Sequence, residues 1–243
     1  KLCSKLRKRN VLITIATGRG VVPALNYAKI LGIKIPIICL GGSLTVNPLN
    51  KDIIRETKLD KKISINLISK LDPNYYEVGL YYGETLYINE LSEWSKGYIE
   101  RQDIPYIIDP DFSQALKSNP TMILAVSTPK NIDSIENYLK DFVKNSLSIV
   151  RSMPHFYEIS NSEGNKFHAL TSLLQNLKLN FGNVITFGNG KADIEIIKNS
   201  GIGISIRNSP TEVLGISDLT VETPEKQGVE NFLEEFFFKG KYV

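Results

Sequence analysis

The stretch that most constrains the fold is residues 184–208, VITFGNGKADIEIIKNSGIGISIRN. It begins with a short apolar run at 184–187, passes through a glycine turn, and continues into a helical pattern that carries Asp193. A second apolar run follows at 203–206. An apolar run that is bounded by glycine and leads into a helix is typical of the strand–loop–helix unit of a parallel sheet. The sequence therefore predicts an α/β fold.

The same stretch also indicates where a functional site would lie. In open α/β sheets, ligands bind just beyond the carboxyl ends of the strands. The residues at that place are Gly188, Asn189, Gly190 and Asp193. We therefore expect this turn to form part of a binding or catalytic site.

A second strand–loop unit is predicted near the start of the chain. Residues 11–16, VLITIA, form a β-branched run that predicts a strand buried on both faces. Thr17, Gly18, Arg19 and Gly20 follow it. A hydroxyl, backbone N–H groups and an arginine at the end of a strand can bind a phosphate. The alternative is a plain strand-to-helix turn in which Thr17 caps the helix at 21–31.

Residues 35–40 predict another buried strand, which is followed by Gly41 and Gly42 and by a hairpin partner at 43–46. The paired glycines indicate a close backbone approach or a positive φ. Residues 51–59 have a helical pattern. From about residue 50 the strand–glycine pattern stops, and it returns only at 157–160. We therefore expect an inserted second domain between the two parts.

The inserted region mixes strands with helices and is rich in tyrosine. A strand is predicted at 122–127, a helix at 130–144, and another strand at 148–152. The tyrosines at 75, 76, 81, 82 and 87 are typical of strands with aromatic cross-strand pairs. A ligand-stacking role is the alternative.

Lys166 stands at the start of a predicted helix, at 166–179. A cation there opposes the helix dipole, so either an anion beside the ammonium or plain solvent exposure would account for it.

The two histidines, His155 and His168, have no neighbour at metal-ligand spacing. The serine, histidine and aspartate residues are scattered and support no catalytic triad.

Composition excludes several classes of protein. The chain has 243 residues, of which 42% are hydrophobic and 23% charged, as in a folded globular protein. A net charge of +3 is too small to indicate nucleic acid or a membrane surface. No apolar run approaches the roughly 18 residues of a membrane span. Two cysteines, Cys3 and Cys39, favour a reducing compartment, and we expect a cytoplasmic protein.

Taken in order, these motifs resemble those of the haloacid dehalogenase (HAD) superfamily and, more narrowly, the Cof-type phosphatases with a class II cap. The matching residues are Ile15-Ala16-Thr17-Gly18-Arg19, Leu40-Gly41-Gly42, Lys166 after Glu158-Ile159, Gly188-Asn189-Gly190-Lys191-Ala192-Asp193, and Asn208 near the next strand end. The resemblance implies a three-layer αβα core of Rossmann type, residues 1–49 and 154–243. It implies an inserted, mobile α+β cap domain at residues 50–153.

The resemblance also implies Mg²⁺-dependent hydrolysis of a small phosphorylated metabolite, such as a sugar phosphate, through an aspartyl-phosphate. Thr17 would hydrogen-bond the phosphoryl oxygens, and Lys166 would pair with the phosphate and the nucleophilic carboxylate. The residues that it assigns to phosphate or substrate are Thr17, Gly18, Arg19, Gly41, Gly42, Lys166 and Asn208, and those for the metal are Asn189 and Asp193. Because a dianionic phosphate and a carboxylate repel each other, such a site needs a metal ion and a cation between them.

The chain departs from the family pattern in three places. The family's opening Asp-x-Asp motif, which carries the nucleophile, is absent from residues 1–40. We expect it in a segment before Lys1, because a lost central strand would leave backbone groups unpaired. Asn189 stands where the family usually has Asp, and a neutral amide is a poorer Mg²⁺ ligand. Gly41 replaces the usual Asn.

Two rival hypotheses stay open. The first is a catalytically degenerate relative that binds a phosphorylated ligand or a protein partner, which Asn189 and Gly41 favour. The second is a nucleotide-binding Rossmann module. That module would need Gly-x-Gly-x-x-Gly after its first strand, and the turn at Gly188 and Gly190 lacks the third glycine.

Overall fold

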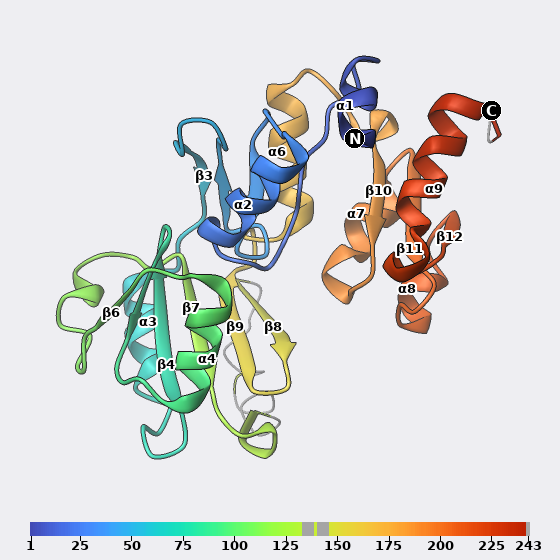
Figure 1. The fold of residues 1–243 in the computed structure, drawn as a ribbon. Helices are drawn as coiled ribbons and strands as arrows, with labels where there is room; N and C mark the ends of the chain where they lie inside the picture. Colours follow the sequence, from blue (N-terminus) through green and yellow to red (C-terminus); the bar gives the residue numbers. More distant parts are fainter. Residues whose placement is uncertain (133–138, 140–145, 242–243) are drawn as a thin grey trace.

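The structure, a computed structural model, describes residues 1–132, 139 and 146–241. Its strands form three sheets (Figure 1). The first contains β1 (Ile37–Cys39), β2 (Leu44–Val46) and β3 (Ile53–Glu56), paired antiparallel. The second has six strands in the order β6-β5-β4-β7-β9-β8, and the third is β10-β11-β12. None of the described helices is long and apolar enough to cross a membrane.

The N-terminal part begins with α1 (Leu2–Arg7) and continues through residues 11–16 into α2 (Val21–Leu31). Residues 11–16 lie beside β1, where Ala16 forms a parallel bridge with Ile38. The expected doubly buried strand is wrong: Leu12 is 52% exposed and the other residues are only half-buried. The reason is that, within the described chain, this segment has a hydrogen-bonding neighbour on one side only.

The predicted helix at 51–59 is also wrong, because residues 53–56 form β3. Thr45 of β2 pairs with Arg55 of β3, so the β1–β2 hairpin gains a third strand. Ile53 and Ile54 are β-branched, which suits a strand once an unpaired edge is close. The helical periodicity of the segment is overridden by this tertiary pairing.

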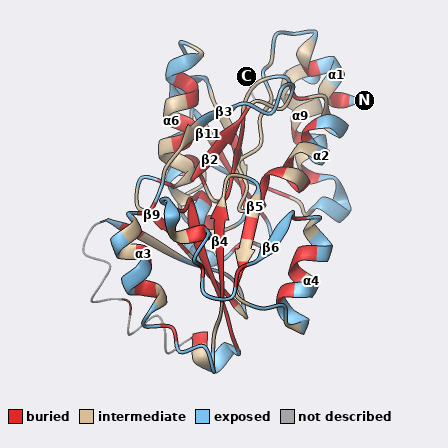
Figure 2. Cartoon of the chain, turned by 90° about the vertical axis from the view of Figure 1, so that its left-hand side faces the viewer, coloured by how far each residue is buried: buried red, intermediate tan, exposed pale blue. Residues whose placement is uncertain are grey.

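The six-stranded sheet has a helix on each face. Its strands are β4 (Glu77–Tyr82), β5 (Thr85–Ile88), β6 (Tyr106–Ile108), β7 (Met122–Val126), β8 (Leu147–Met153) and β9 (Phe156–Asn161). α4 (Glu93–Gln102) packs on one face and α3 (Lys61–Ile68) on the other, as the buried positions in Figure 2 indicate. Tyr82 and Tyr87 form an edge-to-face pair with centroids 5.4 Å apart, in line with the predicted aromatic pairs. Most of the predicted helix at 130–144 lies outside the described residues.

The expected domain boundaries at 50 and 153 do not follow the sheets. β3 belongs to the N-terminal sheet, whereas β9, which the sequence pattern assigned to the core, lies between β7 and β8 in the six-stranded sheet. The apolar run of β9 resembles a core strand because it is covered on both faces in the cap as well. We propose that the cap spans residues 57–161.

The C-terminal part is a parallel three-stranded sheet between helices. It contains α6 (Lys166–Asn176), β10 (Ile185–Gly188), α7 (Ile194–Asn199), β11 (Ile202–Ile206), α8 (Thr211–Leu214), β12 (Leu219–Val221) and α9 (Gly228–Glu234). Ile196 of α7 packs with α6, while Phe232 of α9 covers the other face of the sheet at Ile204. Short 3₁₀ turns lie at Ala115–Lys117, Phe181–Asn183, Lys191–Asp193 and Pro224–Lys226, and a π-turn at Glu235–Lys239 ends α9.

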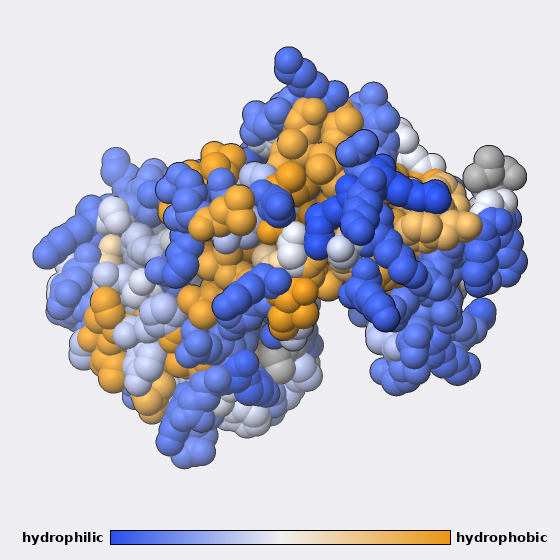
Figure 3. All heavy atoms as spheres, turned by 45° about the horizontal axis from the view of Figure 1, so that its top comes forward, coloured by the Kyte–Doolittle hydropathy of each residue, from blue (hydrophilic) through white to orange (hydrophobic). Residues whose placement is uncertain are grey.

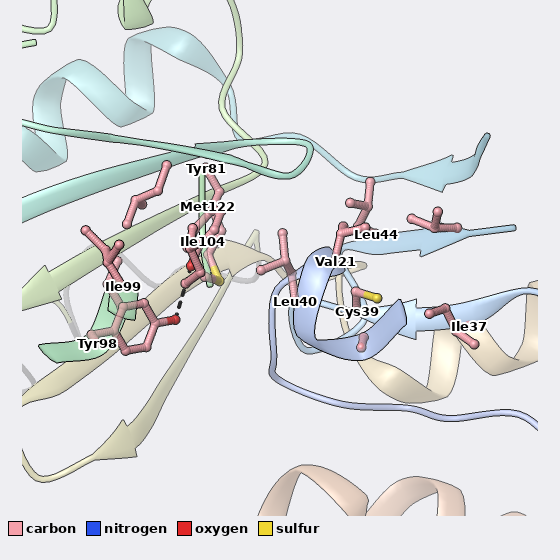
Figure 4. Packing of buried hydrophobic residues seen from close by; sticks show 14 of the residues in the cluster. Val21, Ile37, Cys39, Leu40, Leu44, Tyr81, Tyr98, Ile99, Ile104 and Met122 are labelled. Carbon is pink, nitrogen blue, oxygen red and sulfur yellow. Dashed lines mark hydrogen bonds between the residues drawn. The ribbon is translucent and has the colours of Figure 1, made fainter. Parts of the chain in front are cut away.

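One hydrophobic cluster runs from the N-terminal sheet into the cap. It joins residues of α2, β1 and β2 to residues of β4, β7 and α4 (Figure 4). Leu40, 1% exposed, lies between the two groups. In Figure 3, hydrophobic side chains gather in the middle of the visible face, and the part that carries β10–β12 is mainly hydrophilic. The cap is therefore packed against the N-terminal part of the core in this conformation.

Candidate functional site

The loop after Ala16 is fixed to the loop after β1 by backbone hydrogen bonds. Thr17 N–H donates to Ile38 O at 2.9 Å, Gly41 N–H donates to Thr17 O at 3.0 Å, and Leu40 N–H donates to Arg19 O at 3.0 Å. These bonds hold the predicted phosphate loop and the glycine pair side by side. The two segments that sequence analysis assigned to the phosphate therefore do meet.

Thr17 does not cap α2. Its Oγ1 accepts a hydrogen bond from Arg19 N–H at 3.1 Å, inside the loop, and Gly20 is the N-cap residue of α2. No side chain caps α2, so its first amides keep their capacity to donate. An uncapped helix start beside a Thr-Gly-Arg loop is suited to an anion. Arg19 itself is exposed, with its guanidinium 5.7 Å from the Tyr27 ring centroid.

The two glycines after β1 have different reasons for being glycine. Gly41 has φ +65°, and a Cβ there would contact nothing within 4 Å. Gly42 has φ +114°, and a Cβ there would lie 2.1 Å from the carbonyl carbon of Asn165. Gly42 and Asn165 also form an antiparallel bridge. The close approach that the glycine pair predicted is therefore made by Gly42, against the turn before α6.

Lys166, the first residue of α6, is the buried cation of the candidate site. Its Nζ lies 2.6 Å from Asp193 Oδ1, and the side chains of Lys166 and Asp193 are only 12% and 10% exposed. The alternative of a solvent-exposed lysine is wrong. The carboxylate offsets the unfavourable position of a cation at a helix N-terminus. The pair connects the N-terminal start of α6 to the loop after β10.

Asp193 is held by the turn that carries it. Its Oδ2 accepts hydrogen bonds from the N–H groups of Asn189 and Gly190, both at 3.0 Å. A Cβ at Gly188 would lie 2.6 Å from the Cβ of Asp193, so only glycine allows this turn to fold so tightly. Both carboxylate oxygens of Asp193 therefore already have partners.

The described residues do not by themselves complete a metal site. They contain no group of three or more His, Cys, Asp or Glu side chains that could hold an ion. Asp193 is the buried carboxylate at this edge, and Asn189 is exposed. Mg²⁺ takes one or two protein carboxylates and several waters, so Asp193 and Asn189 could supply at most part of its ligands.

Asn208 is placed differently from the other expected residues. It lies two residues beyond β11, and its side chain is exposed and forms no hydrogen bond with another described residue. The contacts that join Thr17, Gly41, Gly42, Lys166 and Asp193 into one site do not include it.

Sequence analysis missed the cap residues that reach this site. A Cβ at Gly18 would lie 4.0 Å from Glu158 Oε2, so the β9 carboxylate borders the predicted phosphate loop. Behind it, the Tyr81 and Tyr98 hydroxyls are 3.2 Å apart. Burial, and secondarily Glu158, raises the pKa of Tyr98 to about 12, so both tyrosines stay neutral donors. Glu158-Ile159 is among the residues that carry the family resemblance, and this was the sequence signal that could have pointed to Glu158.

Comparisons with known proteins support the fold. The chain is similar to the 5-amino-6-(5-phospho-D-ribitylamino)uracil phosphatase YitU of Bacillus subtilis, at 22% identity over 96% of this chain and 87% of that protein. A haloacid dehalogenase-like hydrolase from Bacteroides thetaiotaomicron matches with a TM-score of 0.87 at 20% identity, over 97% of this chain and 90% of the other. The sugar phosphatase BT4131, of HAD subclass IIB, matches with a TM-score of 0.77 at 15% identity, over 97% and 89%.

These structural matches confirm the predicted fold, a HAD-like α/β core with an inserted cap. The family model described as haloacid dehalogenase-like hydrolase matches residues 1–233. That span includes the Thr17 loop, the glycine pair, Lys166 and Asp193. The chain therefore belongs to the haloacid dehalogenase-like hydrolases.

Proposed function

We propose that this hydrolase removes phosphate from a small phosphorylated metabolite, and that its substrates are sugar phosphates. The observation that carries the proposal is the buried Lys166–Asp193 pair, because it fixes an ammonium group next to Asn165, which bridges Gly42 beside the Thr17 loop and the uncapped start of α2. A fixed cation with preorganised N–H groups stabilises the charge of a phosphoryl group in its transition state.

Each site residue has a proposed part in this chemistry. Thr17 and the uncapped amides of α2 bind phosphoryl oxygens, and Arg19 adds charge at the exposed rim. Lys166 faces the phosphate, and Asp193 orients Lys166. Because both oxygens of Asp193 are engaged, we do not assign it as the nucleophile. Gly18 and Gly41 let the backbone approach the ligand, Gly42 seats this loop on the turn before α6 beside it, and Asn208 stays a proposed contributor to phosphate binding.

We further propose that hydrolysis requires Mg²⁺, as the family implies. When bound, the ion would neutralise phosphate charge and polarise the phosphoryl oxygens. Asn189 and Asp193 are the residues that we propose near it. Because they do not complete a site, we derive no step through the metal.

The substrate class is supported by the relatives' names. YitU is named for a compound with a phosphorylated ribityl group, and BT4131 is named a sugar phosphatase. Glu158 beside Gly18 offers acceptors for the hydroxyls that a sugar phosphate would bring. The two free cysteines, one of them buried, suit the reducing compartment that we propose, the cytoplasm.

The test is phosphate release by the full-length protein from p-nitrophenyl phosphate and from a panel of sugar phosphates. We expect release with Mg²⁺, its loss on chelation with EDTA, and its recovery when Mg²⁺ is returned. Binding of inorganic phosphate without any turnover would instead support the degenerate, ligand-binding hypothesis. The absence of both phosphate binding and turnover would overturn the proposal.

A further inference from the structure

Arg55 of β3 joins the two loops that carry the candidate site. Its Nη1 donates to the Gly42 carbonyl oxygen at 2.9 Å, and its Nη2 donates to the Glu163 carbonyl oxygen at 2.7 Å. Gly42 follows β1, whereas Glu163 belongs to the turn before α6. The planar fork of a guanidinium group suits two acceptors at once. Arg55 therefore acts as a clamp between two segments that are distant in sequence.

The junction that Arg55 clamps is tightly packed. A Cβ at Gly164 would lie 2.5 Å from Ser43 Oγ and 2.7 Å from Thr57 Oγ1. Ser43 Oγ also donates to the Gly164 carbonyl oxygen at 3.3 Å. With the Gly42–Asn165 bridge, these contacts seat the turn at 161–165 directly on residues 42 and 43. A shift of the turn would therefore shift the start of α6.

The start of α6 determines where Lys166 lies. Asn165 is the N-cap residue, and its Oδ1 accepts a hydrogen bond from His168 N–H at 2.8 Å. Lys166 follows immediately and reaches Asp193 at 2.6 Å. Small displacements of a catalytic group reduce rate strongly, because the reacting geometry is narrow.

We propose that Arg55 is a positioning residue for the hydrolysis reaction: it acts through the turn at 163–165 to hold the Lys166 ammonium in place. The inference rests on the proposed function where it concerns turnover. The Arg55 side chain does not need to touch the substrate. Hydrogen bonds from a charged donor are about twice as strong as neutral ones, which suits a clamp.

The charge environment agrees with this role. Burial lowers the pKa of Arg55, and the nearby Glu163 carboxylate opposes that effect. The guanidinium is therefore partly desolvated and still charged at neutral pH. A lysine at position 55 would carry the charge but could not bridge both carbonyl groups in the same plane.

The first experiment compares Arg55→Ala and Arg55→Lys with Arg7→Ala. Arg7 is a matched control, because its Nη1 donates to the Leu31 carbonyl oxygen at 2.6 Å, away from the candidate site. We expect kcat for p-nitrophenyl phosphate to fall about 10- to 100-fold in Arg55→Ala, less in Arg55→Lys, and not in Arg7→Ala. Millimolar guanidinium should restore part of the kcat of Arg55→Ala, and none for Lys166→Met. A kcat of Arg55→Ala within twofold of wild type overturns the proposal, as does an equal loss in Arg7→Ala.

A second readout separates this proposal from the proposed function. Amide hydrogen exchange at Glu163 and Gly164, whose N–H groups bond to Asn161, reports on the turn without any substrate. We expect faster exchange there in Arg55→Ala and unchanged exchange in Arg7→Ala. If the wild type releases no phosphate, the proposed function fails, and the exchange result still decides whether Arg55 holds the turn. Unchanged exchange in Arg55→Ala overturns the clamp itself.

Discussion

The two sheets that carry the candidate site differ in how well they are buried. In β1, Ile37, Ile38 and Cys39 are fully buried. They pack with residues of α2 and α6 and belong in part to the hydrophobic cluster that runs into the cap. In the β10–β12 sheet, the buried cluster is small, and two of its members, Ile206 and Val221, are still 9% exposed. β10 itself alternates between buried and half-buried residues. The first sheet has a deep core, and the other does not.

The difference matters because the site straddles both sheets. Within the described residues, neither residues 11–16 nor β10 has a hydrogen-bonding strand on the side away from its own sheet. The two parts meet instead through packing of α6 on α7 and through the Lys166–Asp193 pair, with a weaker surface pair between Lys5 and Glu234 at 3.3 Å. Within the described residues, these side-chain contacts are what join the two parts of the site.

The largest expected effect is that of Lys166→Met on the contact between the two parts of the site. It removes the cation that joins the two parts and leaves the buried Asp193 carboxylate without its counter-charge. We expect kcat/KM for phosphate release to fall by about 10²–10³-fold. The matched control is Lys198→Met, at an exposed lysine on α7. A loss no greater than that of the control would show that the pair is not part of the site.

The next largest effect is expected at the glycine pair. In Gly42→Ala the new Cβ would overlap the Asn165 backbone at 2.1 Å, so the start of α6 must move. We expect the free energy of unfolding to fall by about 3 kcal/mol or more, with loss of activity. In the control Gly41→Ala the cost is only the strain of φ +65°, about 1–2 kcal/mol. Urea unfolding measures both, and equal losses would contradict the close-approach argument.

Core truncations should show that the two sheets differ in stability. Ile38→Ala removes a 0% exposed side chain between β1 and α6, whereas Ile206→Ala removes a 9% exposed one from the smaller cluster. We expect losses of about 4 and about 2 kcal/mol in the free energy of unfolding, measured by urea denaturation. A larger loss for Ile206→Ala would reverse the ranking of the two cores.

The smallest effect concerns Cys39 in β1. Burial raises its pKa to about 12, whereas the pKa of a cysteine in the unfolded chain is about 8.5. The unfolded state therefore binds fewer protons above about pH 8.5, so this group's contribution to stability is full below that pH and falls as pH rises toward 12. Ellman's reagent at pH 8 should label the half-buried Cys3 and spare Cys39 until urea is added. Equal labelling rates in the native protein would contradict the deep burial of β1.

Local sequence was sufficient for the turns and for several elements. Gly41 and Gly42 stand where a positive φ or a close contact excludes a side chain, as the paired glycines predicted, and Gly188 lies in the predicted glycine turn. β10, α7 and β11 were predictable from residues 184–208 alone, because the apolar patterns of the strands and helix and the glycines that separate them all lie within that stretch. The start of a helix at Lys166 was also predictable, but the unfavourable cation there left open whether an anion or solvent lay beside it, and only the structure identified Asp193 as the partner.

Only the tertiary structure decided which sheet each strand joins. β3 and β9 are short segments that mix apolar with charged or polar residues, and nothing in their own pattern distinguishes the N-terminal sheet from the cap. The same applies to Arg55, whose two acceptors come from loops that meet only after the chain has folded. A sequence pattern encodes which face of a segment is apolar. The neighbour that covers that face is set by long-range packing, which is why the boundaries, the half-exposed residues 11–16 and the Arg55 clamp became visible only in three dimensions.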